Sequence, residues 1–236
     1  MAAQSRVVRL EKSRMLSSRV RSLTFRDASG EAVRYQPGQW IRLRLPVGEG
    51  WVEQPYSIAG APDPKASDTF EVAVSSAQEG MASVLHELPE GATIQAGVPD
   101  GRFVWQDARR GPALFVASGT GLAPFRAMLQ TVVAPEGPAL VLLFGCRTEA
   151  EILWADEFRD LERRLPRFRF EVSLSQPSPR WSGRRGYVQL HLPELVRSLE
   201  PVEILVAGST EMVASVKDHV KRLGVRDAAI RTEQQP

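Results

Sequence analysis

Short runs in which apolar and polar residues alternate dominate the chain from Arg6 to about Phe103. The clearest of these runs cover residues 6–10, 20–25 and 41–45. A period of two predicts half-buried antiparallel strands. Turn-forming Gly, Pro and Asp residues separate the runs, so this half predicts a small antiparallel β-barrel. We expect one helix within it, at residues 83–88, with Ser83 at the N-cap position.

Beyond residues 107–112 the pattern changes to near-continuous apolar runs that alternate with longer helical patterns. The apolar runs cover residues 113–117, 140–144 and 204–207. The helical patterns cover residues 122–133, 150–165 and 211–223. Such apolar runs predict parallel strands buried on both faces and joined by crossover helices. We therefore expect a β-barrel domain over residues 1–108, an α/β parallel-sheet domain over residues 109–236 and a polar C-terminal tail.

Composition narrows the classes of function. The 236 residues include 30 Lys and Arg against 28 Asp and Glu, a formal net charge of +2, and the basic residues occur as scattered short pairs. This pattern disfavours binding to nucleic acid. One cysteine, Cys146, and three dispersed histidines predict no disulfide, iron–sulfur cluster or metal site within the chain. Because no run approaches the ~18 apolar residues of a membrane span, we expect a soluble cytoplasmic protein.

A glycine-containing turn follows the first apolar run of the second half. Residues 113–117 lead into Ser118-Gly119-Thr120-Gly121-Leu122-Ala123-Pro124, and an amphipathic helical pattern follows. The glycines permit a tight turn with close backbone approach, and the start of the helix offers unpaired N–H groups to a phosphate. Pro124 replaces the third glycine of the usual dinucleotide fingerprint and is tolerated in a first helical turn. The same pattern also fits an ordinary strand-to-helix turn.

Two segments of the first half contain further candidates for ligand binding. Gln54-Pro55-Tyr56-Ser57 carries a ring suited to stacking on a planar group and a hydroxyl suited to a ring nitrogen. Gly80-Met81-Ala82-Ser83 places a glycine and a serine where a helix is expected to begin, a position suited to an anion. Taken separately, the first segment also fits a core strand and the second a simple N-cap.

Taken in order, these segments resemble the ferredoxin–NADP reductase-like oxidoreductases. Gln54 to Ser57 resembles that family's Arg-x-Tyr-Ser flavin motif, residues 80–83 its flavin-phosphate motif and residues 119–124 its pyridine-nucleotide loop. Later landmarks of the family are similar to residues 145–147, 181–188 and 207–212. The resemblance covers nearly the whole chain and implies an FAD-binding barrel followed by an NAD(P)-binding α/β domain, which agrees with the division drawn from periodicity.

The resemblance also implies roles for individual residues. Tyr56 and Ser57 would be the catalytic pair, with Tyr56 packed on the isoalloxazine and Ser57 hydrogen-bonded near its reactive N5. Gly119 to Gly121 would seat the nicotinamide nucleotide. The residues implied in cofactor binding are Gln54, Pro55, Tyr56, Ser57, Val72, Ala73, Val74, Gly80, Met81, Ala82, Ser83, Gly119, Thr120, Gly121, Pro124, Arg147, Ser175, Gly208 and Met212.

Three features depart from the family pattern. Gln54 stands in place of the arginine that offsets the flavin pyrophosphate charge, and a neutral amide cannot supply bidentate charged donation, so weaker FAD retention is expected. Ala207 stands where many members have a cysteine beside the nicotinamide C4, and residues 232–236 lack the terminal aromatic of some members. These two differences either slow hydride transfer or leave the nicotinamide pocket more open.

The choice between NADPH and NADH depends on the end of the strand expected at residues 170–175. An acidic side chain there would receive the ribose 2′-hydroxyl of NADH. The strand instead ends at Ser175, with Arg180, Arg184 and Arg185 following. This ending favours NADPH.

The sequence thus predicts an FAD-dependent NAD(P)H reductase that passes electrons to a protein or small-molecule acceptor. Two alternatives stay open: a non-catalytic module that binds flavin, nucleotide or a partner, and an electron-transfer subunit that needs another chain to supply an iron–sulfur or haem centre. Cys146 is interpreted as a buried apolar-like residue at a strand end. His86, His191 and His219 are interpreted as a helix-surface, a loop and a helix histidine, without catalytic roles.

Overall fold

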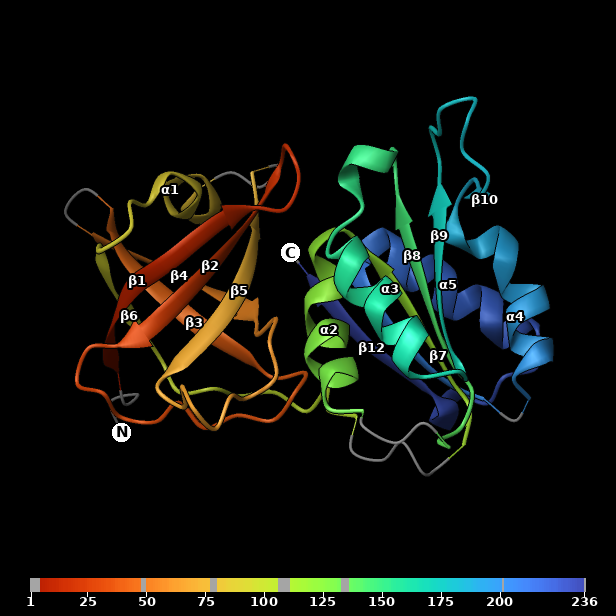
Figure 1. Cartoon of the computed structure of the whole chain (residues 1–236), viewed down its shortest axis with the longest axis horizontal. Coiled ribbons are helices and arrows are strands. Elements are labelled where there is room, and N and C mark those ends of the chain that lie inside the picture. Colours follow the sequence, from red (N-terminus) through yellow and green to blue (C-terminus); the bar gives the residue numbers. More distant parts are fainter. Residues whose placement is uncertain are drawn as a thin grey trace. The chain divides into compact units, whose positions relative to one another are not determined.

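The computed structural model describes residues 5–47, 50–76, 80–105, 111–132, 136–200 and 202–235. The chain forms two compact units, labelled by element in Figure 1. The first unit comprises residues 1–105 and 123–131, and the second comprises residues 106–122 and 132–236. The expected domain boundary at residue 109 lies outside the described residues, so it stays a prediction.

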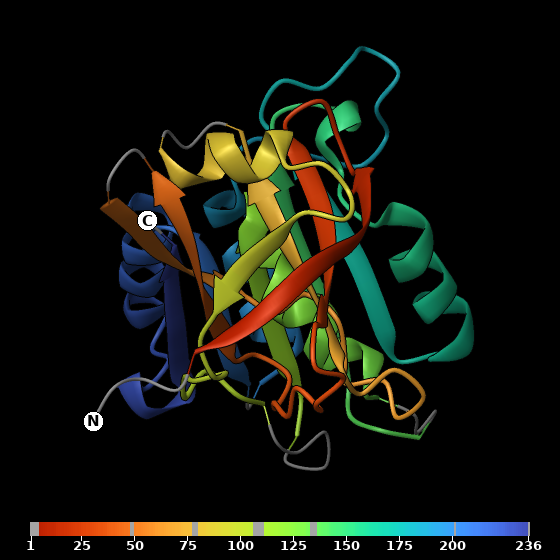
Figure 2. The same ribbon diagram turned by 90° about the vertical axis from the view of Figure 1, so that its left-hand side faces the viewer.

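The first unit is built on a six-stranded antiparallel sheet. Its strands are β1 (Arg6–Met15), β2 (Val20–Asp27), β3 (Trp40–Val47), β4 (Gly50–Ser57), β5 (Thr69–Ser75) and β6 (Thr93–Ala96). They are ordered β4-β3-β6-β1-β2-β5, and an Ile58–Val72 bridge joins the end of β4 to β5 at the far side of the sheet. Closure through this bridge makes the sheet a barrel (Figure 2), which confirms the expected antiparallel β-barrel.

Alternation along the strands supplies the core of the barrel. Leu23 and Phe25 of β2 and Ile41 and Leu43 of β3 are fully buried, while Arg42 between the latter two is exposed. Every second side chain of a strand points to the same face, so this spacing directs one apolar row inward. Burying each such side chain stabilises the barrel by roughly 1.5–3 kcal/mol.

A helix between β5 and β6, α1 (Met81–Glu87), lies at one end of the barrel (Figure 2). It begins two residues earlier than expected, because Gly80 adopts φ +76° and serves as its N-cap. Ser83 is therefore the third residue of the helix, and its prediction as the N-cap is wrong. Met81, Ala82 and Leu85 form the buried face of α1, whereas Ser83 is exposed.

The second unit is built on a six-stranded parallel sheet. Its strands are β7 (Ala113–Ser118), β8 (Leu140–Cys146), β9 (Phe168–Leu174), β10 (Arg184–Arg185), β11 (Glu203–Ser209) and β12 (Ile230–Gln235). They are ordered β10-β9-β8-β7-β11-β12, and every pair is parallel. The expected α/β parallel-sheet domain is confirmed. The expected polar tail is wrong, because its residues form β12 against β11.

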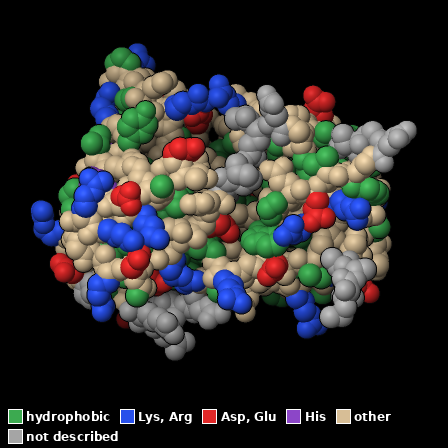
Figure 3. All heavy atoms as spheres, turned by 180° about the vertical axis from the view of Figure 1, so that it is seen from behind, with side chains coloured by type: hydrophobic (Ala, Val, Ile, Leu, Met, Phe, Trp, Pro, Cys, Tyr) green, Lys and Arg blue, Asp and Glu red, His purple; other side chains and the backbone are tan. Residues whose placement is uncertain are grey.

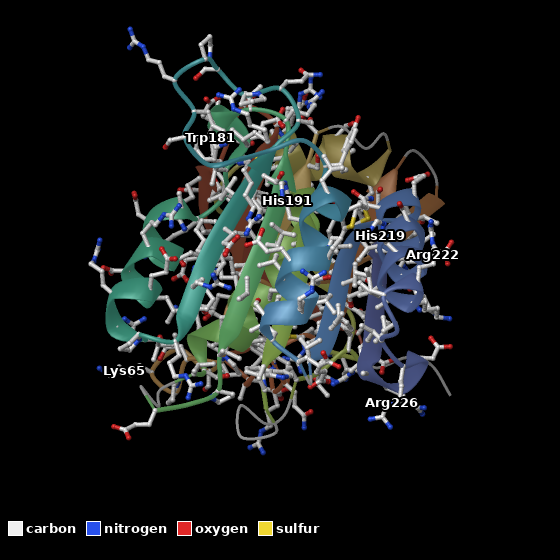
Figure 4. The ribbon with its side chains drawn as sticks, turned by 90° about the vertical axis from the view of Figure 1, so that its right-hand side faces the viewer. Lys65, Trp181, His191, His219, Arg222 and Arg226 are labelled. Atoms are coloured by element: carbon white, nitrogen blue, oxygen red, sulfur yellow. The ribbon has the colours of Figure 1, made fainter. Side chains whose placement is uncertain are left out.

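Helices cover both faces of this sheet. The helices that follow the strands are α3 (Ala155–Arg164), α4 (Leu192–Ser198) and α5 (Thr210–Arg222), with 3-10 turns at Gly119–Gly121, Glu149–Glu151, Val188–His191 and Asp227–Ala229. On one face α3 packs through Phe158 against Phe170 of β9, with ring centroids 4.9 Å apart. On the other face α4 and α5 share an apolar cluster with β7 and β8 (Figures 1 and 4).

Helix bounds differ from expectation in several places. The pattern over residues 150–165 becomes a 3-10 turn followed by α3, because Trp154 takes the left-handed φ of 49° between them. The helix expected at residues 122–133 is α2 (Leu122–Gln130), whose residues from Ala123 onward belong to the first unit. The hydrophobic pattern of the sequence predicts no helix at the position of α4.

In the described part of the chain no helix is long and apolar enough to cross a bilayer. Basic and acidic side chains are interspersed on the face that Figure 3 presents.

Candidate functional site

The parallel sheet reverses its direction of growth between β7 and β11. From β7 the chain adds β8, β9 and β10 on one side, and then returns to add β11 and β12 on the other. In open α/β sheets, ligands bind outside the carboxyl ends of the strands at such a switch point. The turn Gly119–Gly121 follows β7 there, and Gly208 and Ser209 end β11 beside it. The sequence-predicted nucleotide residues Gly119, Thr120, Gly121 and Gly208 are thus brought together within the second unit.

Two glycines shape this turn in different ways. Gly119 adopts φ +53°, and a Cβ placed on it would meet nothing within 4 Å. A Cβ placed on Gly121 would lie 2.3 Å from the carbonyl oxygen of Ala207 and 2.6 Å from the amide nitrogen of Gly208. Gly121 therefore allows the turn to pack directly against the backbone of β11, and Gly119 leaves open space above the turn.

The end of β11 is equally crowded. Gly208 has φ +153°, and a Cβ there would lie 2.4 Å from Ser118 Oγ and 2.5 Å from Met212 Cε. Ser209 caps α5 by accepting from the Met212 backbone N–H at 3.3 Å. Met212 thus lies against the glycine at the switch point.

The ends of β8 and β9 carry the next group of candidates. Arg147 N–H groups donate to Glu151 in a close ion pair, with Nη2 2.7 Å from Oε1, so its guanidinium already has a carboxylate partner. Ser175 follows β9, and its N–H donates to the Cys146 carbonyl at 3.1 Å. Burial, with smaller contributions from Glu151 and Glu149, raises the pKa of the Cys146 thiol to about 12, so the thiol stays protonated at neutral pH.

The loop from Ser175 to Tyr187 is held by its own arginines. Arg185 Nη2 donates to the backbone carbonyls of Trp181 at 2.8 Å and Ser178 at 3.2 Å. Arg184 pairs with Glu171 and with Glu194, the latter at 2.9 Å. Arg180 is exposed. Of the three arginines that favoured NADPH in the sequence, Arg184 is neutralised by two carboxylates.

His191 forms part of the support of this loop, which projects beyond the strands and carries Trp181 (Figure 4). Ser173, buried in β9, donates to the Gly186 carbonyl at 2.7 Å, so its Oγ accepts from His191 Nε2 at 2.9 Å. His191 Nδ1 then faces Arg184 Nη1 at 3.3 Å as an acceptor. Burial, and next the Arg184 charge, lower the pKa of His191, so the imidazole is held neutral. The simple loop assignment of His191 missed this role.

The barrel carries the flavin candidates. Tyr56 is buried and its hydroxyl donates to Gln54 Oε1 at 3.2 Å, so the two side chains lie on the same face of β4. Burial raises the pKa of Tyr56 above its usual value, and the phenol stays neutral. Ser57 is half-buried on the opposite face of the strand, and Pro55 is exposed.

The strand β5 presents an edge next to this motif. Val72, Ala73 and Val74 are buried and pair with β2 on one side. On its other side, β5 is paired among the described residues only through the Ile58–Val72 bridge. The backbone of Ala73 and Val74 therefore forms a sheet edge.

The start of α1 has the donors that a phosphate needs. No side chain caps the first turn of α1, in which Met81, Ala82 and Ser83 stand. The N–H groups of a first helical turn have no intrahelical acceptors, and an anion satisfies them. Gly80, which has open space around its Cα, leaves room for such a group. No group of three or more metal-ligating side chains occurs in the part of the chain that the structure describes.

Comparison with known proteins relates this geometry to a family. Residues 7–105 match the oxidoreductase FAD-binding domain and residues 115–218 the oxidoreductase NAD-binding domain. The chain is 41% identical over 235 residues to ferredoxin–NADP reductase B of Sorangium cellulosum, covering 96% of both proteins. The chain belongs to the ferredoxin–NADP reductase-like family. As a member it is a flavin-dependent NAD(P)H oxidoreductase that uses FAD to pass electrons from NAD(P)H to an acceptor. This sets aside the non-catalytic alternative.

Other relatives are more distant. The anthranilate 1,2-dioxygenase electron transfer component of Acinetobacter baylyi is 28% identical over 85% of this chain, which spans 58% of that protein. Among solved structures, the FAD/NAD-binding domain of nitric oxide dioxygenase from Vibrio cholerae gives a TM-score of 0.85 at 22% identity, covering 98% of both chains. A ferredoxin NADP+ reductase from Neisseria gonorrhoeae gives 0.81 at 20%, covering 98% and 99%. These solved structures share the two-domain fold of this family member.

Proposed function

We propose that this reductase takes its electrons from NADPH and delivers them through FAD to a ferredoxin-type protein. The observation that carries the proposal is the 41% identity, over 96% of both chains, to a protein named as a ferredoxin–NADP reductase. Bound FAD would supply the step that accepts a hydride and releases electrons singly. The chain's own residues would bind and orient the two cofactors and the acceptor.

In the barrel, Tyr56 would present its ring to the isoalloxazine and Ser57 its hydroxyl to N5. The Tyr56–Gln54 hydrogen bond, 3.2 Å long, would fix the angle of the phenol ring. Val72 to Val74 would offer backbone groups along the β5 edge. The first turn of α1, with Gly80 before it, would bind the flavin phosphate, and Gln54 with Pro55 would adjoin it without the usual positive charge.

In the second unit, the Gly119–Gly121 turn would seat the nicotinamide nucleotide, with Pro124 in the helical turn that follows it. Gly208 and Met212 would line the opposite wall. The support for this assignment is the switch-point position of the turn and the open space above Gly119. Arg147 would serve the ribose or phosphates only by exchanging or sharing its contact with Glu151.

NADPH is the proposed donor because the strand end carries no acid. Ser175 would leave space for a 2′-phosphate, whereas an acidic side chain would repel it. Arg180 and Arg185 follow on the loop, and the hydrogen bonds of the Arg185 guanidinium go to neutral backbone carbonyl groups. Both are exposed to solvent, where a phosphate can reach them.

A ferredoxin is the proposed acceptor because it would bring the iron–sulfur cluster that this sequence, with one cysteine, cannot ligate. The similarity to a dioxygenase electron transfer component favours a second candidate, the ferredoxin or oxygenase of a multicomponent system. Because NADPH is a cytoplasmic reductant, we also propose a cytoplasmic location, which cell fractionation would test.

The test follows the visible spectrum of the FAD-loaded protein anaerobically during titration with NADPH and with NADH. We expect the flavin bands to bleach, with a higher kcat/KM for NADPH than for NADH. Adding a [2Fe–2S] ferredoxin and, separately, free flavin or ferricyanide then ranks the acceptors. A preference for NADH would overturn the donor assignment. Bleaching that is never reversed by ferredoxin would overturn the acceptor assignment.

A further inference from the structure

Arg126 is a buried arginine in α2, and its side chain is 8% exposed. Among the described residues, no other Lys or Arg is buried to this degree. A buried guanidinium is costly unless its N–H groups are paired, so its partners identify what the side chain holds. The Ala59 carbonyl and the Glu71 carboxylate, which accept from Arg126, belong to the first unit.

Those partners flank the flavin motif. Arg126 Nη1 donates to the carbonyl oxygen of Ala59 at 2.9 Å and to Glu71 Oε2 at 2.8 Å. Ala59 is two residues beyond Ser57, and Glu71 directly precedes Val72. The Ala59 N–H also donates to the Glu71 carbonyl at 2.7 Å. A single side chain of α2 therefore fixes β5 and the segment that continues from β4.

Further hydrogen bonds secure the same segment. The Ala61 N–H donates to Gln130 Oε1, at the other end of α2, at 2.8 Å. The Tyr35 hydroxyl donates to the Gly60 carbonyl at 3.1 Å. The remaining carboxylate oxygen of Glu71 accepts from Ser22, a buried residue of β2. We call Arg126, Glu71, Gln130 and the segment Ala59–Ala61 the helix clamp.

The helix clamp acts on a helix that is continuous with the nucleotide turn. Only Leu122 separates Gly121 from the residues of α2 that belong to the first unit. Any rotation or withdrawal of α2 is therefore passed directly to the Gly119–Gly121 turn. Hydride transfer requires donor and acceptor atoms within about 3–3.5 Å, so small displacements of that turn are costly in rate.

We propose that Arg126 and Glu71 are positioning residues for the reduction of FAD by the nicotinamide nucleotide. They hold α2 onto the strands that carry Tyr56, Ser57 and Val72, without touching either cofactor. The inference rests on the proposed assignment of the Gly119–Gly121 turn to the nicotinamide. It predicts that loss of the helix clamp slows reduction of the flavin while leaving the binding of each cofactor largely intact.

The test compares the wild-type protein with the double variant Arg126→Met/Glu71→Gln, which removes both charges together and so leaves neither buried and unpaired. The matched control is Arg6→Met/Asp27→Asn, which removes an ion pair of the same unit, 2.9 Å long, whose other hydrogen bonds go to Ser29 and Ala32. Arg126→Lys keeps the charge and tests rescue. Amide hydrogen exchange of Ala61 in the FAD-free protein reports directly whether the helix clamp has opened.

We expect Ala61 exchange to rise at least tenfold in the helix-clamp double variant, with the Kd values for FAD and NADPH changed less than threefold. The rate of flavin reduction at saturating NADPH should fall at least tenfold, with partial recovery in Arg126→Lys and no comparable fall in the control. A reduction rate within twofold of wild type despite fast Ala61 exchange would overturn the inference. If the wild-type protein binds NADPH but its flavin is reduced only by NADH, the proposed donor is refuted instead. The flavin reduction rates of the wild-type and variant proteins would then be compared with NADH.

Discussion

Two physical arguments give opposite expectations for the stability of a Gly121→Ala variant. Its φ is not in the left-handed region, so on backbone grounds alone Gly121→Ala should stabilise the fold by about 0.4–1 kcal/mol. The close approach to β11 predicts the reverse, because the new Cβ would lie 2.3 Å from the Ala207 oxygen and 2.5 Å from its carbonyl carbon. Both atoms are backbone and cannot rotate away, so the turn itself must move.

Overpacking of this kind costs about 1–3 kcal/mol. At about 2–4 °C per kcal/mol for a chain of this size, Gly121→Ala should lower Tm by about 2–12 °C and weaken NADPH binding at least tenfold. Thermal unfolding and nucleotide titration of the FAD-loaded protein measure both effects. Gly97→Ala is the matched control, since a Cβ there meets only ordinary contacts, with Arg42 Cβ at 3.7 Å. Equal Tm values for the two variants would refute the close-packing argument.

Three further predictions concern single side chains. Gln54→Arg should lower the Kd for FAD about tenfold by restoring a charge-assisted hydrogen bond, as measured by flavin fluorescence; an unchanged Kd would mean that Gln54 does not face the pyrophosphate. Ser175→Asp should lower the NADPH/NADH ratio of kcat/KM at least tenfold, and an unaltered ratio would place nucleotide selection elsewhere. Because the pKa of His191 is lowered on folding, the unfolded state binds more protons below pH 6.5, and stability should fall as pH falls through that region. His191→Gln should reduce this fall; an identical pH profile would contradict it.

Periodicity correctly predicted the strands whose side chains are buried on one face or on both faces of a sheet. The near-continuous apolar runs of β7, β8 and β11 and the alternation in β2 and β3 left little choice of structure. By contrast, β12 contains Ile230 followed by Arg231, Thr232 and Glu233, and it lies at the edge of the sheet. An edge strand needs apolar residues only where it meets the core, so its sequence reads as a polar tail.

Local geometry explains the errors at helix ends. Ser83 has the side chain of a good N-cap, but Gly80, three residues earlier and with φ +76°, occupies the N-cap position. Trp154 interrupts a continuous helical pattern by taking a left-handed φ, which bulky residues rarely adopt. The seven residues of α4 are too few to show a helical period.

The site was predictable where a motif is contiguous and hidden where it is assembled from distant residues. Gly119 and Gly121 of the candidate nucleotide turn are separated only by Thr120, so their pattern was visible in the sequence, although the close packing of Gly121 against β11 was not. Arg126 and Glu71 are 55 residues apart, and each by itself reads as a solvated charge on an amphipathic element. Only the fold shows that they are partners.

The same long-range contacts show that a domain boundary drawn at one position in the sequence does not separate the residues that pack together. Helix α2 lies within the segment matched to the NAD-binding domain, residues 115–218, yet its residues 123–131 belong to the first unit. Phe125 packs against Phe103 with ring centroids 5.7 Å apart, and Arg126 is paired with Glu71. A fragment starting at residue 109 would lose both of these contacts. We therefore expect such a fragment to have a less stable α2, and nucleotide binding measured on it to underestimate that of the intact protein.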